Sequence, residues 1–181
     1  MNFHRCEVEG AWVIEPERHE DERGFFARTW DCDEFARRDL PDTVVQTSIS
    51  YNRRRGTLRG LHYQSSPHEE AKLVRCTWGA IFDVVVDLRP GSATFRRWAG
   101  VDLTAKNRHA LYIPAACAHG FLTLQDDSEV AYQMTAPHVP QAARGVRYDD
   151  PAFGITWPTD VTVINDRDRS YPDFEPSATA S

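Results

Sequence analysis

A group of acid, base and cationic side chains stands on segments whose alternating pattern is typical of strands. A histidine has an ordinary pKa of about 6.5 and can accept a proton near neutrality. Lysine and arginine can hold an anion, and arginine does so through a planar fork of several donors. The group suits proton transfer on an anionic substrate, and its members are His62, Lys72, His119, Tyr132, Arg59 and Arg23.

A metal centre is the first alternative chemistry. Small β-barrels often bind a metal through a His-x-His pair, a carboxylate and a third histidine. The histidines stand at positions 4, 19, 62, 68, 109, 119 and 138, and no two are separated by one, three or four residues. We therefore expect no metal and no cofactor. Ligands far apart in sequence can still converge, which leaves a metal-dependent barrel enzyme open as an alternative.

Motifs for nucleophilic and nucleotide-cofactor chemistry are absent from the sequence. It contains no Gly-x-Ser-x-Gly elbow and no Gly-rich dinucleotide or triphosphate loop. The cysteines at 6, 32, 76 and 117 include no Cys-x-x-Cys pair, which predicts reduced thiols in a cytoplasmic protein. Cys76 lies in a strand-like run and is predicted to be a core residue.

Composition limits the partners. The 181 residues carry a net charge of -6, which argues against a general nucleic-acid binder. No signal peptide and no membrane span is apparent in the sequence. A cluster of arginines could still contact an anion locally: Arg53 to Arg55 are typical of a solvated loop, whereas Arg59 lies within a patterned segment.

Short strands separated by turn residues must position these side chains. Residues 81–88 alternate between two faces, and a strand pattern also covers 72–78, 110–113, 121–124 and 129–135. One short helix is predicted from Asp31 to Arg38. Residues 1–172 are expected to form a single domain, with a flexible tail at 173–181. Many evenly spaced strands favour a sandwich or barrel, with a jelly roll as the leading candidate.

The same alternation predicts which side chains face inward. Val130, Tyr132 and Met134 share one face of their segment, the face predicted to point into the barrel. His62 shares the parity of Gly60, whereas Arg59 has the opposite parity. From pattern alone, Tyr132 could be an ordinary core tyrosine and His62 a structural histidine.

Several longer motifs occur in a fixed order. They are Asp21-Glu22-Arg23-Gly24-Phe25-Phe26, Gly56 to Gln64, Ala71-Lys72-Leu73-Val74-Arg75, Phe82 to Arg89, Ala118-His119-Gly120-Phe121, and Asp150-Pro151 leading to Ile155-Thr156-Trp157-Pro158. With these motifs the sequence resembles the dTDP-4-dehydrorhamnose 3,5-epimerase family from about Asp21 to Asp168.

The resemblance implies an all-β, cupin-like double-stranded β-helix (jelly-roll) barrel with short peripheral helices, usually a homodimer and without a metal or cofactor. It implies an isomerase that inverts carbons C3, C5 or both beside the ketone of a nucleotide-diphosphate 4-keto-6-deoxy sugar. A single-position epimerase, a 3,4-ketoisomerase on another such sugar and a non-catalytic sugar-binding barrel remain alternatives.

The resemblance also implies residue roles, by residue-by-residue match to the family. His62 corresponds to the general base and Asp168 to its carboxylate partner. Tyr132 corresponds to the acid that protonates carbon from the opposite face, and Lys72 to the residue facing the enolate oxygen. Positions near the diphosphate or sugar are matched by Arg23, Arg59 and His119.

Some positions depart from the family's common pattern. Arg28 stands where a glutamate is frequent, and Glu70 where a glutamine is frequent. These differences leave the nucleotide base, the exact sugar and the number of inverted carbons open. The remaining predicted substrate-binding residues are Phe26, Arg28, Gln46, Ser48 and His138.

Overall fold

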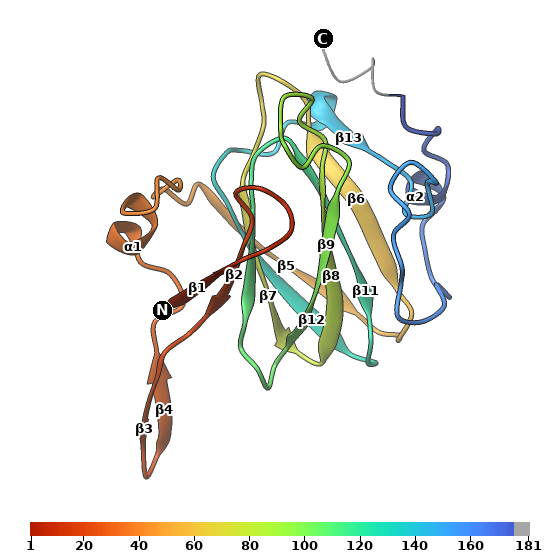
Figure 1. Ribbon diagram of the computed structural model, residues 1–181. Helices are drawn as coiled ribbons and strands as arrows, with labels where there is room; N and C mark the ends of the chain where they lie inside the picture. Colours follow the sequence, from red (N-terminus) through yellow and green to blue (C-terminus); the bar gives the residue numbers. More distant parts are fainter. Residues whose placement is uncertain (176–181) are drawn as a thin grey trace.

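Two antiparallel sheets form the body of the protein in a computed structural model that describes residues 1–175 (Figure 1). The larger sheet has the order β1 (Asn2–Arg5), β2 (Trp12–Glu15), β10 (Ala110–Ile113), β7 (Lys72–Trp78), β12 (Ser128–Met134) and β5 (Gln46–Asn52). The smaller sheet has the order β13 (Ala143–Gly145), β6 (Leu58–Gln64), β11 (Cys117–Thr123), β8 (Ala80–Asp87) and β9 (Trp98–Thr104).

The remaining elements are short and peripheral. The strands β3 (Arg18–Asp21) and β4 (Gly24–Ala27) form a hairpin that projects away from the two sheets (Figure 1). The helices are α1 (Cys32–Ala36), α2 (Asp166–Arg169) and a 3₁₀ turn at Pro140–Ala142. The Asp31 side chain accepts a hydrogen bond from the Glu34 amide at 3.1 Å and caps α1, within the helix predicted at 31–38.

The main core lies between the two sheets. Val130 and Cys76 from the larger sheet and Val85 and Phe121 from the smaller sheet are among its buried members. Tyr132 packs against the same cluster, so the predicted inward face of its strand is confirmed for Val130 and Tyr132. The strands predicted at 72–78 and 110–113 have these bounds, whereas β11 begins earlier than predicted, at Cys117.

A second apolar cluster covers the outer face of the smaller sheet. It contains Leu61, Val84 and Val86, and the C-terminal segment packs on it through Trp157 and Phe174. Strand β8 is thus buried on both faces, which explains its nearly continuous apolar sequence.

The beginning of the predicted tail is held in place. Arg147 Nη1 lies 2.8 Å from a carboxylate oxygen of Asp173, and the Phe174 amide donates to Asp150 at 2.6 Å. The Phe153 and Phe174 rings lie 5.0 Å apart. The rest of the predicted tail, residues 176–181, lies outside the described residues.

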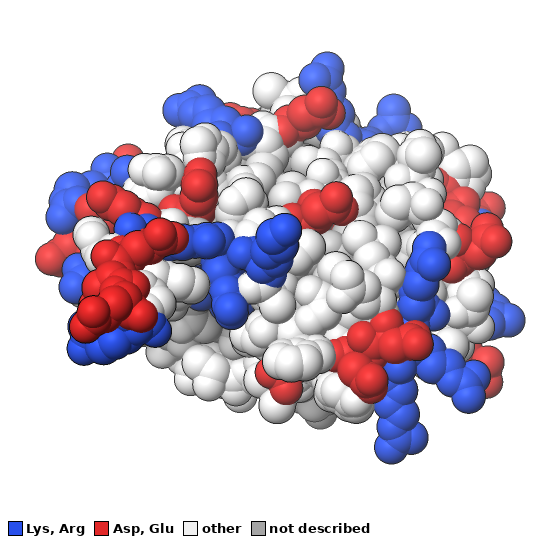
Figure 2. Space-filling model, turned by 90° about the horizontal axis from the view of Figure 1, so that it is seen from below, with Lys and Arg blue, Asp and Glu red and all other residues white. Residues whose placement is uncertain are grey.

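The surface carries charges of both signs. Seen from below, Figure 2 shows acidic and basic side chains gathered at two sides with a broad uncharged area between them. All four cysteines are free, as predicted. Within residues 1–175, no helix has the length and apolar character needed to cross a membrane.

Candidate active site

A cavity of about 280 Å³ between the two sheets gathers most of the predicted chemical residues. Strand β6 supplies Arg59 and His62, while Lys72 and Tyr132 come from β7 and β12 of the facing sheet. The predicted residues that line it are Arg59, His62, Lys72, His119, Tyr132 and Asp168. Arg59 and Asp168, which lie 109 positions apart in sequence, therefore share one small polar space.

The histidine of β6 is fixed by a carboxylate from α2. His62 Nε2 lies 2.7 Å from Asp168 Oδ1, and the Gly60 amide donates to Asp168 Oδ2 at 3.0 Å. Asn165 caps α2 by accepting from the Asp168 amide at 2.6 Å. Burial of Asp168 opposes its ionisation, but the hydrogen bonds from His62 and Gly60 lower the pKa of the carboxyl overall. Nε2 is thereby occupied and Nδ1 remains as the second ring nitrogen.

A register shift on β6 corrects the predicted faces of this strand. His62 pairs with His119, but Arg59 pairs with Phe121, so three steps along β6 oppose two along β11. This irregularity brings Arg59 and His62 to the same cavity, although strict alternation placed them on opposite faces. At the shift, Gly60 has φ +125°, and an added Cβ would lie 2.5 Å from Gly120 Cα. Only glycine fits there.

Tyr132 reaches the cavity from the opposite sheet. Its ring centroid lies 6.0 Å from that of His119 in an edge-on arrangement. Burial, followed by the nearby charge of Asp83, raises the pKa of Tyr132 well above its ordinary value, against a smaller effect of Arg59. The phenol is therefore protonated at neutral pH.

A second histidine–carboxylate pair lies at the base of the cavity. His119 Nε2 is 2.8 Å from Asp83 Oδ1, and both side chains are buried. Asp83 Oδ2 has no hydrogen-bond partner among residues 1–175. Burial raises the pKa of the Asp83 carboxyl, although His119 opposes the shift.

Lys72 is almost completely enclosed, with 9% of its surface exposed. Its Nζ lies 3.1 Å from Glu70 Oε1 and donates to the His62 carbonyl at 3.3 Å. An ammonium has three donors, so one more is available for a ligand. A neighbouring cavity of about 200 Å³ shares His62 and Lys72 and adds Arg167 and the predicted His138.

Other predicted binding residues lie away from this cavity within the single chain. Arg23 and Phe26 are on the projecting β3–β4 hairpin, and Arg28 pairs with Asp31 at 2.8 Å. On β5, Ser48 pairs in register with Tyr132, and Gln46 Oε1 accepts from the His138 amide at 2.6 Å.

The motif reading missed several polar residues of the site. Asp83 belongs to a matched motif and stands out as a charge within an apolar strand, but its contact with His119 was not foreseen. Asn165 had a usable signal, since an asparagine three residues before Asp168 is a helix-cap pattern. Ser50 also lines the cavity, and its buried Oγ has no partner among residues 1–175. No sequence pattern indicates this residue.

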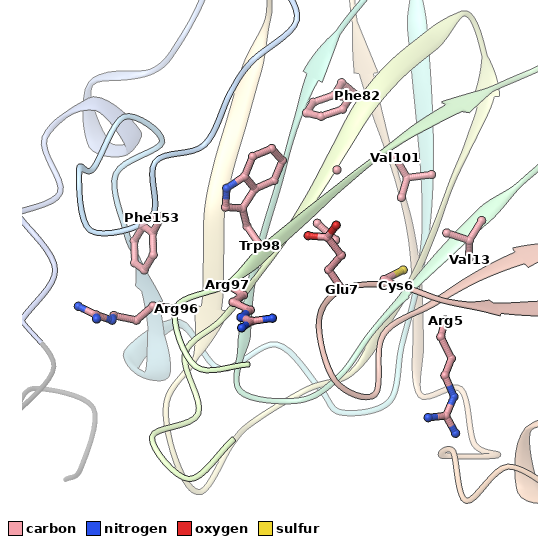
Figure 3. A pocket seen from close by; sticks show the side chains of 12 residues that line it. Arg5, Cys6, Glu7, Val13, Phe82, Arg96, Arg97, Trp98, Val101 and Phe153 are labelled. Atoms are coloured by element: carbon pink, nitrogen blue, oxygen red, sulfur yellow. The ribbon is translucent and has the colours of Figure 1, made fainter. Parts of the chain in front are cut away.

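A larger cavity of about 830 Å³ lies elsewhere, beside β9 and the N-terminal strands (Figure 3). Arg5, Arg96, Trp98 and Val101 are among the side chains around it. None of the predicted site residues lines it. Size alone therefore does not identify the site, and the acid–base geometry favours the smaller cavity.

Comparison with known proteins agrees with the motifs. The family model described as dTDP-4-dehydrorhamnose 3,5-epimerase matches residues 5–176. A dTDP-4-dehydrorhamnose 3,5-epimerase of Sinorhizobium fredii is 40% identical over 95% of this chain and 89% of its own.

Solved structures show the same likeness. The Bacillus anthracis dTDP-4-dehydrorhamnose 3,5-epimerase with TDP and pyrophosphate bound has a TM-score of 0.91 at 34% identity, covering 96% of this chain and 99% of its own. A 3'-monoepimerase from Streptomyces bikiniensis in complex with dTDP-quinovose has a TM-score of 0.87 at 37% identity, covering 98% of this chain and 88% of its own. The predicted jelly-roll fold is confirmed, and the chain belongs to the dTDP-4-dehydrorhamnose 3,5-epimerase family.

Proposed function

We propose that this protein is a nucleotide-sugar epimerase that inverts C3, C5 or both in a dTDP-4-keto-6-deoxyhexose. The observation that carries the proposal is the arrangement of His62 and Tyr132, which come from facing sheets and line one cavity with Lys72. Inversion of a carbon needs a base on one face and an acid on the other. Family membership supplies the substrate class.

In this proposal His62 removes the proton from the carbon beside the ketone. Asp168 occupies Nε2, so Nδ1 accepts the proton. The carboxylate holds the ring in place and stabilises the imidazolium that forms. A positioned base of this kind contributes roughly 10²–10⁴-fold to the rate.

The electron pair of the broken C–H bond forms a C=C bond to the carbonyl carbon, and the π pair of the C=O bond moves onto the oxygen, which gives an enolate. The free donor of Lys72 is directed at this oxygen, where a fixed cation stabilises the developing charge. Tyr132 then donates its proton to the same carbon from the other face. The C=C π pair forms the new C–H bond, the C=O bond is restored, and Tyr132 and His62 recover their starting protonation by exchange with solvent. The raised pKa of Tyr132 keeps the proton available.

The cations around the two joined cavities suit the diphosphate. Arg59 and Arg167 offer planar forks that match phosphate oxygens. The B. anthracis relative was solved with TDP and pyrophosphate, and the S. bikiniensis relative with dTDP-quinovose. These ligands support a nucleotide-diphosphate sugar for the present chain.

A single-position epimerase is the second candidate, because the S. bikiniensis relative is a 3'-monoepimerase of similar fold and identity. The deciding experiment incubates the protein with dTDP-4-keto-6-deoxyglucose in D₂O and follows the product by NMR. Deuterium at both C3 and C5 supports the double epimerase, and deuterium at C3 alone supports the second candidate. Binding without exchange would contradict both. The CDP-linked sugar tests the base preference.

Tyr132→Phe separates the two proton transfers. We expect solvent exchange to survive better than net inversion, because the base on β6 is intact and the opposite-face acid is missing. Equal loss of exchange and inversion would contradict the role of Tyr132.

We also propose that the protein acts as a homodimer. The edge strand β5 exposes Ile49 and Tyr51 on its outer face, with 69% and 51% of their surfaces accessible. Exposed apolar groups of this kind mark interaction surfaces. In a dimer the projecting hairpin could bring Arg23 and Phe26 to the partner's cavity. Light scattering should give about twice the 20.6 kDa chain mass, and Ile49→Asp should shift the mass to that of one chain.

A further inference from the structure

Glu70 lines the smaller cavity of about 200 Å³ and contacts Lys72, which lines both cavities. Its Oε1 is 3.1 Å from Lys72 Nζ, and the side chains of both residues are about nine-tenths buried. Among residues 1–175, Glu70 is the one carboxylate that forms an ion pair with Lys72.

Glu70 is itself fixed by a buried amide. Gln64, with 3% of its surface exposed, donates through Nε2 to Glu70 Oε2 at 3.1 Å. The same amide group contacts the His68 and Pro137 carbonyls, and Gln64 Oε1 accepts from the Val139 amide at 2.6 Å. The carboxylate is therefore held in place before any ligand binds.

Other charged and titratable groups face Lys72 from the surrounding elements. They are Arg59, His62, Asp83, His119, Tyr132 and Asp168. On the side of the smaller cavity they are His138, Arg144 and Arg167. Asp168 is engaged by His62, and Asp83 is engaged by His119. Glu70 is thus the carboxylate best placed to offset the cost of burying the Lys72 charge.

We infer that Glu70 is a positioning residue for Lys72, whose carboxylate keeps the buried ammonium charged and directed at the ketone oxygen; this inference rests on the proposed function. An opposite charge at this distance favours the charged form of a group, and burial disfavours it. Without the carboxylate, Lys72 would lose its proton at a lower pH and stabilise the enolate over a narrower pH range.

The sequence offers an unusually clean test, because Lys72 and Lys106 are its only lysines. Protein labelled with ¹³Cε-lysine should give one buried and one exposed signal, since Lys106 lies in the turn after β9. In Glu70→Gln we expect the Lys72 signal to titrate about one pH unit or more lower than in the wild type. Lys106 should not move. Glu69→Gln removes the same charge one residue away and serves as the matched control.

Activity provides the second measurement. In Glu70→Gln the alkaline limb of kcat for deuterium exchange should move down by the same interval, while Glu70→Asp should restore part of the shift. An unchanged Lys72 titration in Glu70→Gln would overturn the inference even in an active enzyme. Absence of exchange in the wild type would instead overturn the proposed function, and the lysine titration would still decide the role of Glu70.

Discussion

Asp83 and Asp87 lie four residues apart on β8, Asp83 in the middle of the strand and Asp87 as its last residue. Neither has any exposed surface, but their hydrogen-bonding surroundings differ. Asp87 accepts from the amide and guanidinium of Arg89, from Ser92 and from Thr94, and its oxygens have several partners each. Asp83 has one partner, His119, and an oxygen without any among residues 1–175.

The pKa values of the two carboxyls diverge accordingly. Burial opposes ionisation of both groups. At Asp87 the hydrogen bonds from Arg89, Ser92 and Thr94 outweigh it and lower the pKa to about 2, whereas at Asp83 burial prevails and raises the pKa. Asp87 therefore belongs to a network that stabilises the fold. Asp83 has an oxygen without a partner among residues 1–175, and its one partner, His119, lines the cavity. This difference is expected between a structural network and a functional site.

Removing the proposed base should have the largest effect, and this effect should be on catalysis and not on stability. We expect His62→Asn to lower deuterium incorporation by roughly 10²–10⁴-fold, since the positioned proton acceptor is lost. The free energy of unfolding, measured with urea, should stay close to that of the wild type. Exchange at a near wild-type rate would rule out His62 as the base.

Removing the Asp87 carboxylate should lower the free energy of unfolding instead. Asp87→Asn leaves Arg89 without its anion, and we expect a loss of about 3 kcal/mol in the free energy of unfolding. Activity per folded molecule should be unchanged, because neither Asp87 nor any of its hydrogen-bond partners lines the cavity. A stable but inactive Asp87→Asn variant would contradict the distinction between a structural Asp87 and a functional Asp83.

Acid should reproduce part of this loss in the wild type. The pKa of Asp87 falls from 3.8 to about 2 on folding. Its contribution is therefore fully present above pH 3.8 and is lost as the pH falls through about 2, an effect of about 2 kcal/mol. Urea unfolding at several acid pH values should show this slope in the wild type and a flatter one in Asp87→Asn.

Asp83→Asn should change stability least. The amide has nearly the same shape and removes a buried charge, so we expect the free energy of unfolding to change by less than about 1 kcal/mol or to rise. Deuterium exchange should fall, because His119 loses its anionic partner. A loss of stability as large as that of Asp87→Asn would show that the two carboxylates are equivalent after all.

Much of the fold could be predicted because short apolar runs bounded by turn residues mark single strands. The apolar residues of β7 and β10 predicted the bounds of both strands, and Asp31 indicated where α1 begins. The face of β6 could not be predicted, because its register shift depends on the close approach of Gly60 to Gly120. No local pattern encodes a contact between strands.

The site was predictable in its members more than in its geometry. Residue matches to the family supplied His62, Lys72, Tyr132 and Asp168, which the fold brings to one cavity. The partner of His119 remained hidden, since its hydrogen bond with Asp83 joins residues 36 positions apart and no local pattern indicates it. Arg23 and Phe26 were predicted as binding residues as well, but their hairpin lies away from the cavity within the single chain.

The close approach of Gly60 and Gly120 makes each position depend on the other, and no second substitution can relieve the clash that a side chain at either one would cause. A Cβ at 60 would meet Gly120 Cα at 2.5 Å, and one at 120 would lie 2.7 Å from the Arg59 carbonyl. Neither residue has a side chain that could be trimmed to make room for a larger partner. In a saturation library both positions should therefore score as intolerant as the base itself, although neither glycine carries a group that could touch the substrate. Variants of this sequence that keep activity should therefore keep both glycines.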